Sequence, residues 1–136
     1  MIVYVFDASA LLRFTDQEAG ADQVERMFRE MATSAARGCI SAVQWGEIAG
    51  NLAKRFDIDT QRNIQRGLVD LGVEVVPASG ERAVKAAVLR AFEKLSYANA
   101  FAVELALDSP DHILVTADCG FKVVEGAIRI EFLPAK

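Results

Sequence analysis

Four side chains of this sequence have types and positions that suit the binding of a divalent cation. Asp7 and Asp118 each follow a short apolar run, and Glu47 lies inside a helix-like stretch. Asn99 lies near the start of another helix-like stretch. Carboxylates that converge from separate segments are a common way to hold Mg²⁺ or Mn²⁺ for phosphate chemistry. The four residues therefore predict a phosphate-processing site, if the fold brings them together.

The elements that must position these residues alternate between strand and helix. Short apolar, β-branched runs predict strands at 2–6, 39–40, 73–76, 113–115 and 128–132. Helical spacing and capping residues predict helices at 8–13, 21–36, 41–56, 60–71, 81–95 and 96–107. We therefore expect an α/β fold with a mainly parallel central sheet of four or five strands, flanked by helices on both faces.

This layout gives the acids a reason to meet. Ligands of open α/β sheets bind beyond the carboxyl ends of the strands, where Asp7 and Asp118 are expected. Ser41 and Gln44 have the spacing of a capping box, which starts a helix and places Glu47 about two turns into it. The neighbours of Glu47 are mostly apolar, so we expect a buried or half-buried acid that needs a cation or a hydrogen-bond partner.

Each residue also has a purely structural interpretation. Asp7 is a candidate helix N-cap, Asp118 a candidate turn residue, and Asn99 a candidate capping residue in a first helical turn. Taken singly, these interpretations account for every one of the three. Only the order and placement of the residues together favour a shared site.

Length and composition predict one globular domain. The chain has 136 residues, of which 52% are hydrophobic and 25% charged. Its net charge of −4 argues against nonspecific nucleic-acid binding. A local basic rim remains compatible with that charge, because Lys54, Arg55, Arg62 and Arg66 lie close together in the sequence. A solvated helix face is the alternative interpretation of this cluster.

The sequence predicts a cytoplasmic protein. Its longest apolar run, Ile2 to Phe6, is far shorter than the roughly 18 residues that a spanning helix needs, so we expect no membrane contact. We find neither the basic segment nor the cleavage site of a signal peptide. Cys39 and Cys119 lack the spacing of a zinc site or redox motif, which favours reduced thiols.

Four segments resemble the successive motifs of PIN-domain ribonucleases, and most closely those of VapC-type toxins of bacterial toxin–antitoxin pairs. They are residues 7–10, 41–48, 96–101 and 116–121, and the resemblance extends from Met1 to about Pro134. It implies a single PIN-like domain over 1–136. It also implies an endoribonuclease that hydrolyses RNA with Mg²⁺ or Mn²⁺, forms a homodimer and is inhibited by a small antitoxin protein.

The resemblance also implies roles for individual residues. Asp7, Glu47 and Asp118 match three acids of the family and would be the metal ligands. Ser9 and Thr116 match the hydroxyl positions beside them, where a side chain orients a carboxylate or water. These five residues are therefore the expected centre of the site.

Asn99 departs from the pattern, because the family usually has aspartate at this position. An asparagine offers a cation one neutral oxygen, but it supplies no negative charge and no base. Glu104, Asp108 and Asp111 do not replace the missing acid, because they lie on other faces of the helix or at the wrong end of the sheet. Asn99 is either the natural residue or a deliberate substitution. The alternative function is thus a catalytically inactive PIN-domain protein that binds antitoxin or RNA.

Other mechanisms fit less well. The single histidine, His112, precedes a strand, which disfavours histidine acid–base catalysis and favours a surface or capping role. A haloacid-dehalogenase phosphatase would need an acid where Ser9 stands, and a response-regulator receiver would need an acidic pair before the first strand end. For partners, the apolar stretches 83–95 and 98–107 are expected to expose small apolar side chains for a homodimer contact and an antitoxin groove.

Overall fold

A five-stranded parallel sheet forms the centre of the computed structural model, which describes residues 1–136. The strands, in spatial order, are β3 (Val73–Val76), β2 (Ala36–Ser41), β1 (Ile2–Phe6), β4 (His112–Thr116) and β5 (Arg129–Phe132). Every neighbouring pair is parallel. The predicted α/β class and parallel sheet are therefore confirmed.

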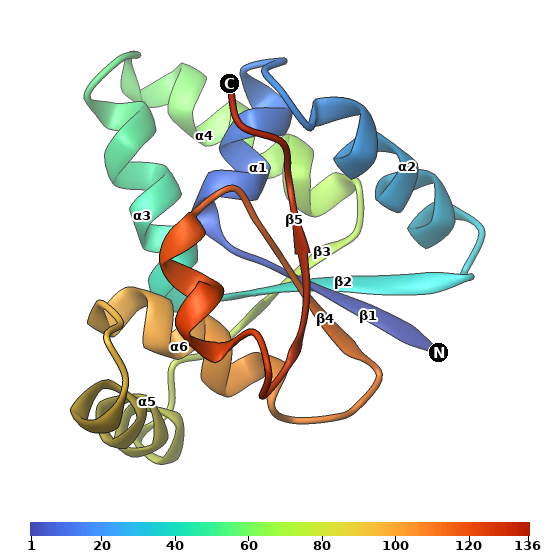
Figure 1. Cartoon of the computed structure of the whole chain (residues 1–136). Coiled ribbons are helices and arrows are strands. Elements are labelled where there is room, and N and C mark those ends of the chain that lie inside the picture. The colour runs from blue at the N-terminus through green and yellow to red at the C-terminus, as the bar shows by residue number, and fades with distance from the viewer.

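Six α-helices and one short 3₁₀ helix cover the sheet (Figure 1). They are α1 (Ala8–Thr15), α2 (Ala21–Ala32), α3 (Ala42–Ala53), α4 (Ile58–Asp70), α5 (Gly80–Phe92), α6 (Tyr97–Ala106) and η1 (Cys119–Val124). Helices α1 to α4 pack into one hydrophobic core, whereas α5, α6 and η1 pack into a second. None of these helices has the length and hydrophobicity needed to cross a membrane.

The two cores lie on opposite faces of the sheet because side chains alternate along a strand. In β1, Tyr4 and Phe6 belong to the core under α1 to α4, and Val5 belongs to the core under α5 and α6. Strand β4 alternates in the same way. The central strands are thus buried on both faces, which explains why they appear in the sequence as continuous apolar runs.

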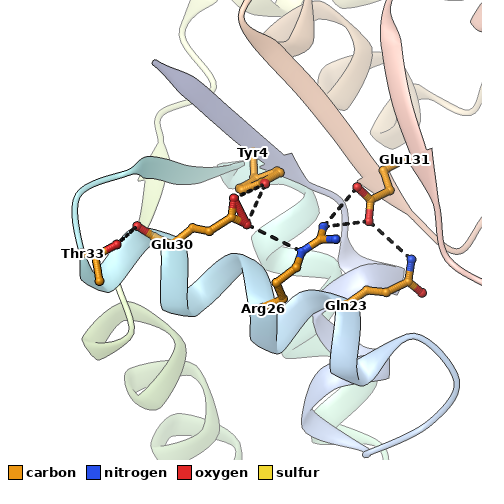
Figure 2. Close-up of polar contacts among 6 residues, drawn as sticks. All are labelled: Tyr4, Gln23, Arg26, Glu30, Thr33 and Glu131. Carbon is orange, nitrogen blue, oxygen red and sulfur yellow. Dashed lines mark hydrogen bonds and ion pairs between the residues drawn. The ribbon is translucent and has the colours of Figure 1, made fainter.

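Polar side chains of α2 join this helix to two strands (Figure 2). The hydroxyl of Tyr4 donates to Glu30 Oε1 at 2.9 Å, and the Arg26 guanidinium lies between Glu30 and Glu131. Burial, with the hydrogen bond and charge of Glu30, raises the pKa of Tyr4 to about 12. The phenol therefore stays a donor at neutral pH and fixes α2 over the start of β1.

Several predicted elements differ from the structure. The helices expected over 41–56 and 81–95 end earlier, at Ala53 and Phe92. The helix expected over 21–36 ends at Ala32, because Ser34 takes a left-handed conformation with φ of 62° and Ala36 already pairs with Ile2 in the sheet. Strand β2 is correspondingly longer than predicted. The stretch 98–107 is not an exposed apolar face, since residues 100–106 of α6 are all buried. Residues 100–106 are core, so their assignment to a partner surface was wrong, whereas Leu107 at the end of the stretch is exposed.

A partly buried ion cluster joins α5 to α6. Arg82 Nη1 lies 2.5 Å from Glu104 Oε1, and Arg82 Nη2 lies 2.6 Å from Asp108 Oδ2. Glu104 is only 3% exposed, and its Oε2 has no hydrogen-bond partner. Burial raises the pKa of Glu104 whereas the bond to Arg82 opposes that rise. Arg82 therefore compensates a carboxylate that the core would otherwise hold unpaired.

We expect Arg82→Met to lower the free energy of unfolding by about 3 kcal/mol, because it leaves a buried charge without its partner. Urea unfolding followed by circular dichroism measures the change. The double variant Arg82→Met with Glu104→Leu should recover most of the loss. Equal stability of the single variant and the original chain would show that the cluster contributes nothing.

Candidate functional site

The candidate site lies where the order of the strands reverses. The chain runs from β1 outward to β2 and β3, then returns to place β4 on the other side of β1. In such sheets, ligands bind beyond the carboxyl ends of the strands at this switch point. Phe6 pairs with Val115, and the Asp7 amide donates to the Val115 carbonyl at 3.2 Å. Residues 7 and 116 therefore meet at the same rim, as the sequence predicts.

Asp7 is almost fully buried, at 2% exposure, and its carboxylate accepts three hydrogen bonds. Oδ1 accepts from the Ser9 hydroxyl at 2.7 Å and from the Ala10 amide at 2.9 Å. Oδ2 accepts from the Thr116 hydroxyl at 2.6 Å. Asp7 is also the N-cap of α1, which confirms its structural interpretation.

The Ser9 and Thr116 hydroxyls each link Asp7 to a backbone amide. The Ala117 amide donates to Ser9 Oγ, and the Asp118 amide donates to Thr116 Oγ1, each at 2.9 Å. Each hydroxyl gives its single hydrogen to Asp7, because an ionised carboxylate can only accept. Ser9 and Thr116 therefore hold one orientation of the Asp7 carboxylate.

Burial nevertheless makes the negative charge of Asp7 unfavourable. Desolvation, with a smaller contribution from the charge of Asp118, raises the pKa of Asp7 from 3.8 to about 6. The bonds from Thr116, Ala10 and Ser9 act in the opposite direction and do not fully compensate. A cation beside Asp7 and Asp118 would offset both the cost of burying the Asp7 charge and the repulsion between the two carboxylates.

Asn99 and Gln44 complete the site beside Asp118. Asp118 caps η1 and accepts from the Gly120 amide at 2.8 Å through Oδ1, and from Asn99 Nδ2 at 3.0 Å through Oδ2. Ser96 caps α6, and its hydroxyl oxygen accepts from the backbone N–H of Asn99 at 3.1 Å. Asn99 therefore lies in the first helical turn, as predicted. Gln44 Nε2 donates to Asn99 Oδ1 at 3.1 Å.

Gln44 is the residue whose role the sequence did not reveal. Its side chain does not return to the start of its own helix, as a capping box requires. Its Oε1 accepts instead from the Ala8 amide at 2.8 Å, and Ser41 alone caps α3. The available signal was the spacing of Gln44, three residues before Glu47 and on the same helical face.

Glu47 differs from its prediction, because it is exposed rather than buried. No hydrogen bond or ion pair joins it to Asp7 or Asp118. Trp45, Ile48 and Leu52 pack into the core that α3 shares with α1, α2 and α4, whereas Glu47 lies outside that face of the helix and is exposed. No group of three histidine, cysteine, aspartate or glutamate side chains lies close enough to hold a metal ion. The structure thus brings Asp7, Ser9, Asn99, Thr116 and Asp118 together, but not Glu47.

The acid pair suits a hard cation by its donor atoms. A carboxylate oxygen accepts up to two bonds, so Asp7 Oδ2 and both oxygens of Asp118 keep one free lone pair each. Asp7 Oδ1 already accepts two bonds. Oxygen donors of this kind are those that Mg²⁺ and Mn²⁺ prefer. Asn99 does not fit as a ligand in its present orientation, since its nitrogen, not its oxygen, faces Asp118.

The raised pKa of Asp7 predicts a pH-dependent stability. The folded state retains a proton that the unfolded state releases between pH 3.8 and about 6, so stability falls as the pH rises through this window. Asp7→Asn removes the charge, and in EDTA it should gain stability over the original chain as the pH rises, by up to about 3 kcal/mol above pH 6. Thermal and urea unfolding from pH 4 to pH 8 measure the difference.

The exposed substitution Asp70→Asn is the control and should show no such gain in this window. A stability difference for Asp7→Asn that stays constant from pH 4 to pH 8 would show that burial does not penalise the Asp7 charge.

Comparisons with solved structures place the fold. The chain resembles VapBC2 from Rickettsia felis, in a complex bound to a promoter DNA fragment, with a TM-score of 0.74, 12% identity and coverage of 98% and 100% of the two chains. A DNA-bound VapBC from Salmonella typhimurium gives a TM-score of 0.71, 18% identity and coverage of 97% and 98%. VapBC-1 from nontypeable Haemophilus influenzae gives a TM-score of 0.65 and 10% identity, with coverage of 96% of this chain and 98% of the other.

These identities are low enough that the structural likeness concerns the fold alone. No curated protein matches the sequence. A family model described as the PIN domain matches residues 4–127, which include Asp7, Glu47, Asn99 and Asp118. Because this match covers most of the sequence, the chain belongs to the PIN-domain family.

Proposed function

We propose that this protein is a metal-dependent endoribonuclease of the VapC type, the toxin of a toxin–antitoxin pair, and that Asn99 weakens its activity. The observation that carries the proposal is the buried Asp7 carboxylate beside Asp118, held at the carboxyl ends of β1 and β4 by Ser9 and Thr116. Membership of the PIN-domain family supports nuclease chemistry. Action on cellular RNA implies a cytoplasmic location.

In this proposal, Asp7 and Asp118 hold the divalent cation, and the exposed Glu47 of α3, which lies apart from them in the structure, turns toward the cation when it binds. When bound, Mg²⁺ or Mn²⁺ supplies positive charge against the phosphate oxygens that carry charge during hydrolysis. Ser9 and Thr116 keep the Asp7 carboxylate oriented and its oxygens in the required positions. Lys54 lies just after α3, and Arg62 and Arg66 lie on α4. All three are exposed and can contact the RNA backbone.

A cognate antitoxin and a second copy of the chain are the proposed partners. Similar folds occur in VapBC complexes and in a toxin–antitoxin complex from Klebsiella pneumoniae, which matches with a TM-score of 0.64 at 18% identity. On α5, Val84, Val88 and Phe92 are 65%, 53% and 83% exposed. Together with Leu107 they form an apolar surface, which we name the α5 strip. We assign the homodimer contact to this strip.

The binding-only alternative retains one supporting observation. The Asn99 amide donates to Asp118 and provides a partner for one of the two acids that a cation would otherwise neutralise. A protein with this arrangement would keep the fold while binding metal poorly. The two functions differ in whether the unaltered chain, with Asn99 in place, cleaves RNA at all.

We expect Asn99→Asp to raise cleavage of RNA by on the order of a hundredfold with Mg²⁺ or Mn²⁺, because it restores a charged ligand at the acid pair. Cleavage of a fluorescent RNA by the purified protein, with EDTA as the metal-free control, measures the effect. Adding Asp118→Asn to the same variant should abolish the gain. If both chains cleave equally well, position 99 is not a catalytic ligand; if the original chain does not cleave at all, the binding-only function is the better description.

A second prediction concerns the homodimer. Phe92→Ser combined with Val84→Ser should shift the protein from dimer to monomer, because it removes the two most exposed side chains of the α5 strip. Size-exclusion chromatography with light scattering reports the mass. Ile58→Ser is the matched control, since Ile58 is 60% exposed on α4, away from the strip. An original chain that is already monomeric at micromolar concentration would exclude the dimer.

A further inference from the structure

The buried Gln44 amide can adopt only one of its two orientations. Its Oε1 lies 2.8 Å from the Ala8 amide nitrogen, which can only donate. Its Nε2 lies 2.8 Å from the Ala98 carbonyl oxygen, which can only accept. A flipped amide would put two donors face to face and two acceptors face to face. Since Gln44 is 2% exposed, water cannot compensate for either clash.

This constraint passes to Asn99. Gln44 Nε2 also donates to Asn99 Oδ1 at 3.1 Å, so Asn99 must present its oxygen to Gln44. The other end of the Asn99 amide, its Nδ2, then faces Asp118 Oδ2 at 3.0 Å. Two backbone groups, on Ala8 and Ala98, thereby decide which atom of residue 99 faces the acid pair. The orientation of Asn99 is imposed and is not a free choice of rotamer.

We propose that Gln44 is a positioning residue that fixes Asn99 as a hydrogen-bond donor to Asp118 and keeps its oxygen away from a cation. This inference rests on the proposed function, in which Asp7 and Asp118 form the cation site. To ligate a cation, Asn99 must turn its oxygen toward Asp118, and this turn breaks its bond from Gln44. Gln44 therefore opposes metal binding in the present chain.

The same glutamine has the opposite effect when residue 99 is aspartate. A carboxylate presents an oxygen in either direction, so one oxygen accepts from Gln44 while the other faces Asp118. Gln44 then holds two carboxylates together in a geometry that only a cation neutralises. The effect of removing the Gln44 amide should consequently change sign with the residue at position 99.

The test measures Mn²⁺ binding in four proteins, by titration calorimetry and by electron paramagnetic resonance of free Mn²⁺. Gln44→Met keeps the side-chain length but removes the amide. In the Asn99 chain, we expect Gln44→Met to tighten Mn²⁺ binding by about tenfold, because Asn99 is released. In the Asn99→Asp background, the same change should weaken Mn²⁺ binding by about tenfold. A shift in the same direction in both backgrounds would overturn the proposal, because a merely structural role predicts it.

A second measurement uses the unaltered protein and remains decisive if Gln44→Met fails to fold. Nuclear magnetic resonance detects scalar couplings across hydrogen bonds in a ¹⁵N,¹³C-labelled sample. A coupling between Asn99 Nδ2 and the Asp118 carboxyl carbon supports the imposed orientation. A coupling between Asn99 Nδ2 and the Gln44 side-chain carbonyl carbon overturns it. If Asn99→Asp fails to bind Mn²⁺ with Gln44 intact, the proposed metal site fails, whereas this coupling still decides the role of Gln44.

Discussion

The parallel pairing of β1 with β4 is the interaction on which the site depends. These strands are separated by more than a hundred residues, yet the Phe6–Val115 register brings Asp7 and Thr116 side by side. One residue of slippage would turn Thr116 to the other face and leave Asp7 without that donor. The two hydrophobic cores stabilise this register. A slip of one residue would move each side chain of the strand from one core to the other, where it does not fit. Burial of the central strands thereby specifies the position of one buried carboxylate.

A carboxylate in such a place is stabilised only by the donors around it. Ser9 and Thr116 give their hydrogens to Asp7, and the backbone amides of Ala117 and Asp118 hold these hydroxyls in place by donating to them. These bonds fix the geometry, but desolvation still raises the pKa of Asp7 to about 6. The fold thus holds a charge that is well oriented and poorly neutralised. That combination favours an incoming cation over a rearrangement of the site.

Much of this arrangement could be predicted from the sequence, and the failures have physical causes. The strand ends of Asp7 and Asp118 follow from apolar runs, since strand alternation and the rim of a parallel sheet are local and general properties. The role of Gln44 could not be predicted, because its partners lie at Ala8 and Ala98 and only the tertiary fold brings them together. Glu47 was predicted to be buried because most of its neighbours are apolar, but the helical spacing of Trp45, Ile48 and Leu52 defines the core face of α3, and Glu47 lies on the other side.

Residue 99 shows how such a network converts a small chemical change into a large electrostatic one. Aspartate and asparagine have nearly the same shape, so the fold and the bond from Ser96 do not distinguish them. The atom that faces Asp118 does differ, being a donor nitrogen in asparagine and an acceptor oxygen in aspartate. Gln44 keeps the Asn99 side-chain amide from flipping to present its oxygen instead. A free asparagine would still offer its oxygen to a cation. A fixed one offers a donor, so in the proposed cation site the exchange removes a charge and a ligand atom together, and we expect the loss of metal affinity to exceed that due to charge alone.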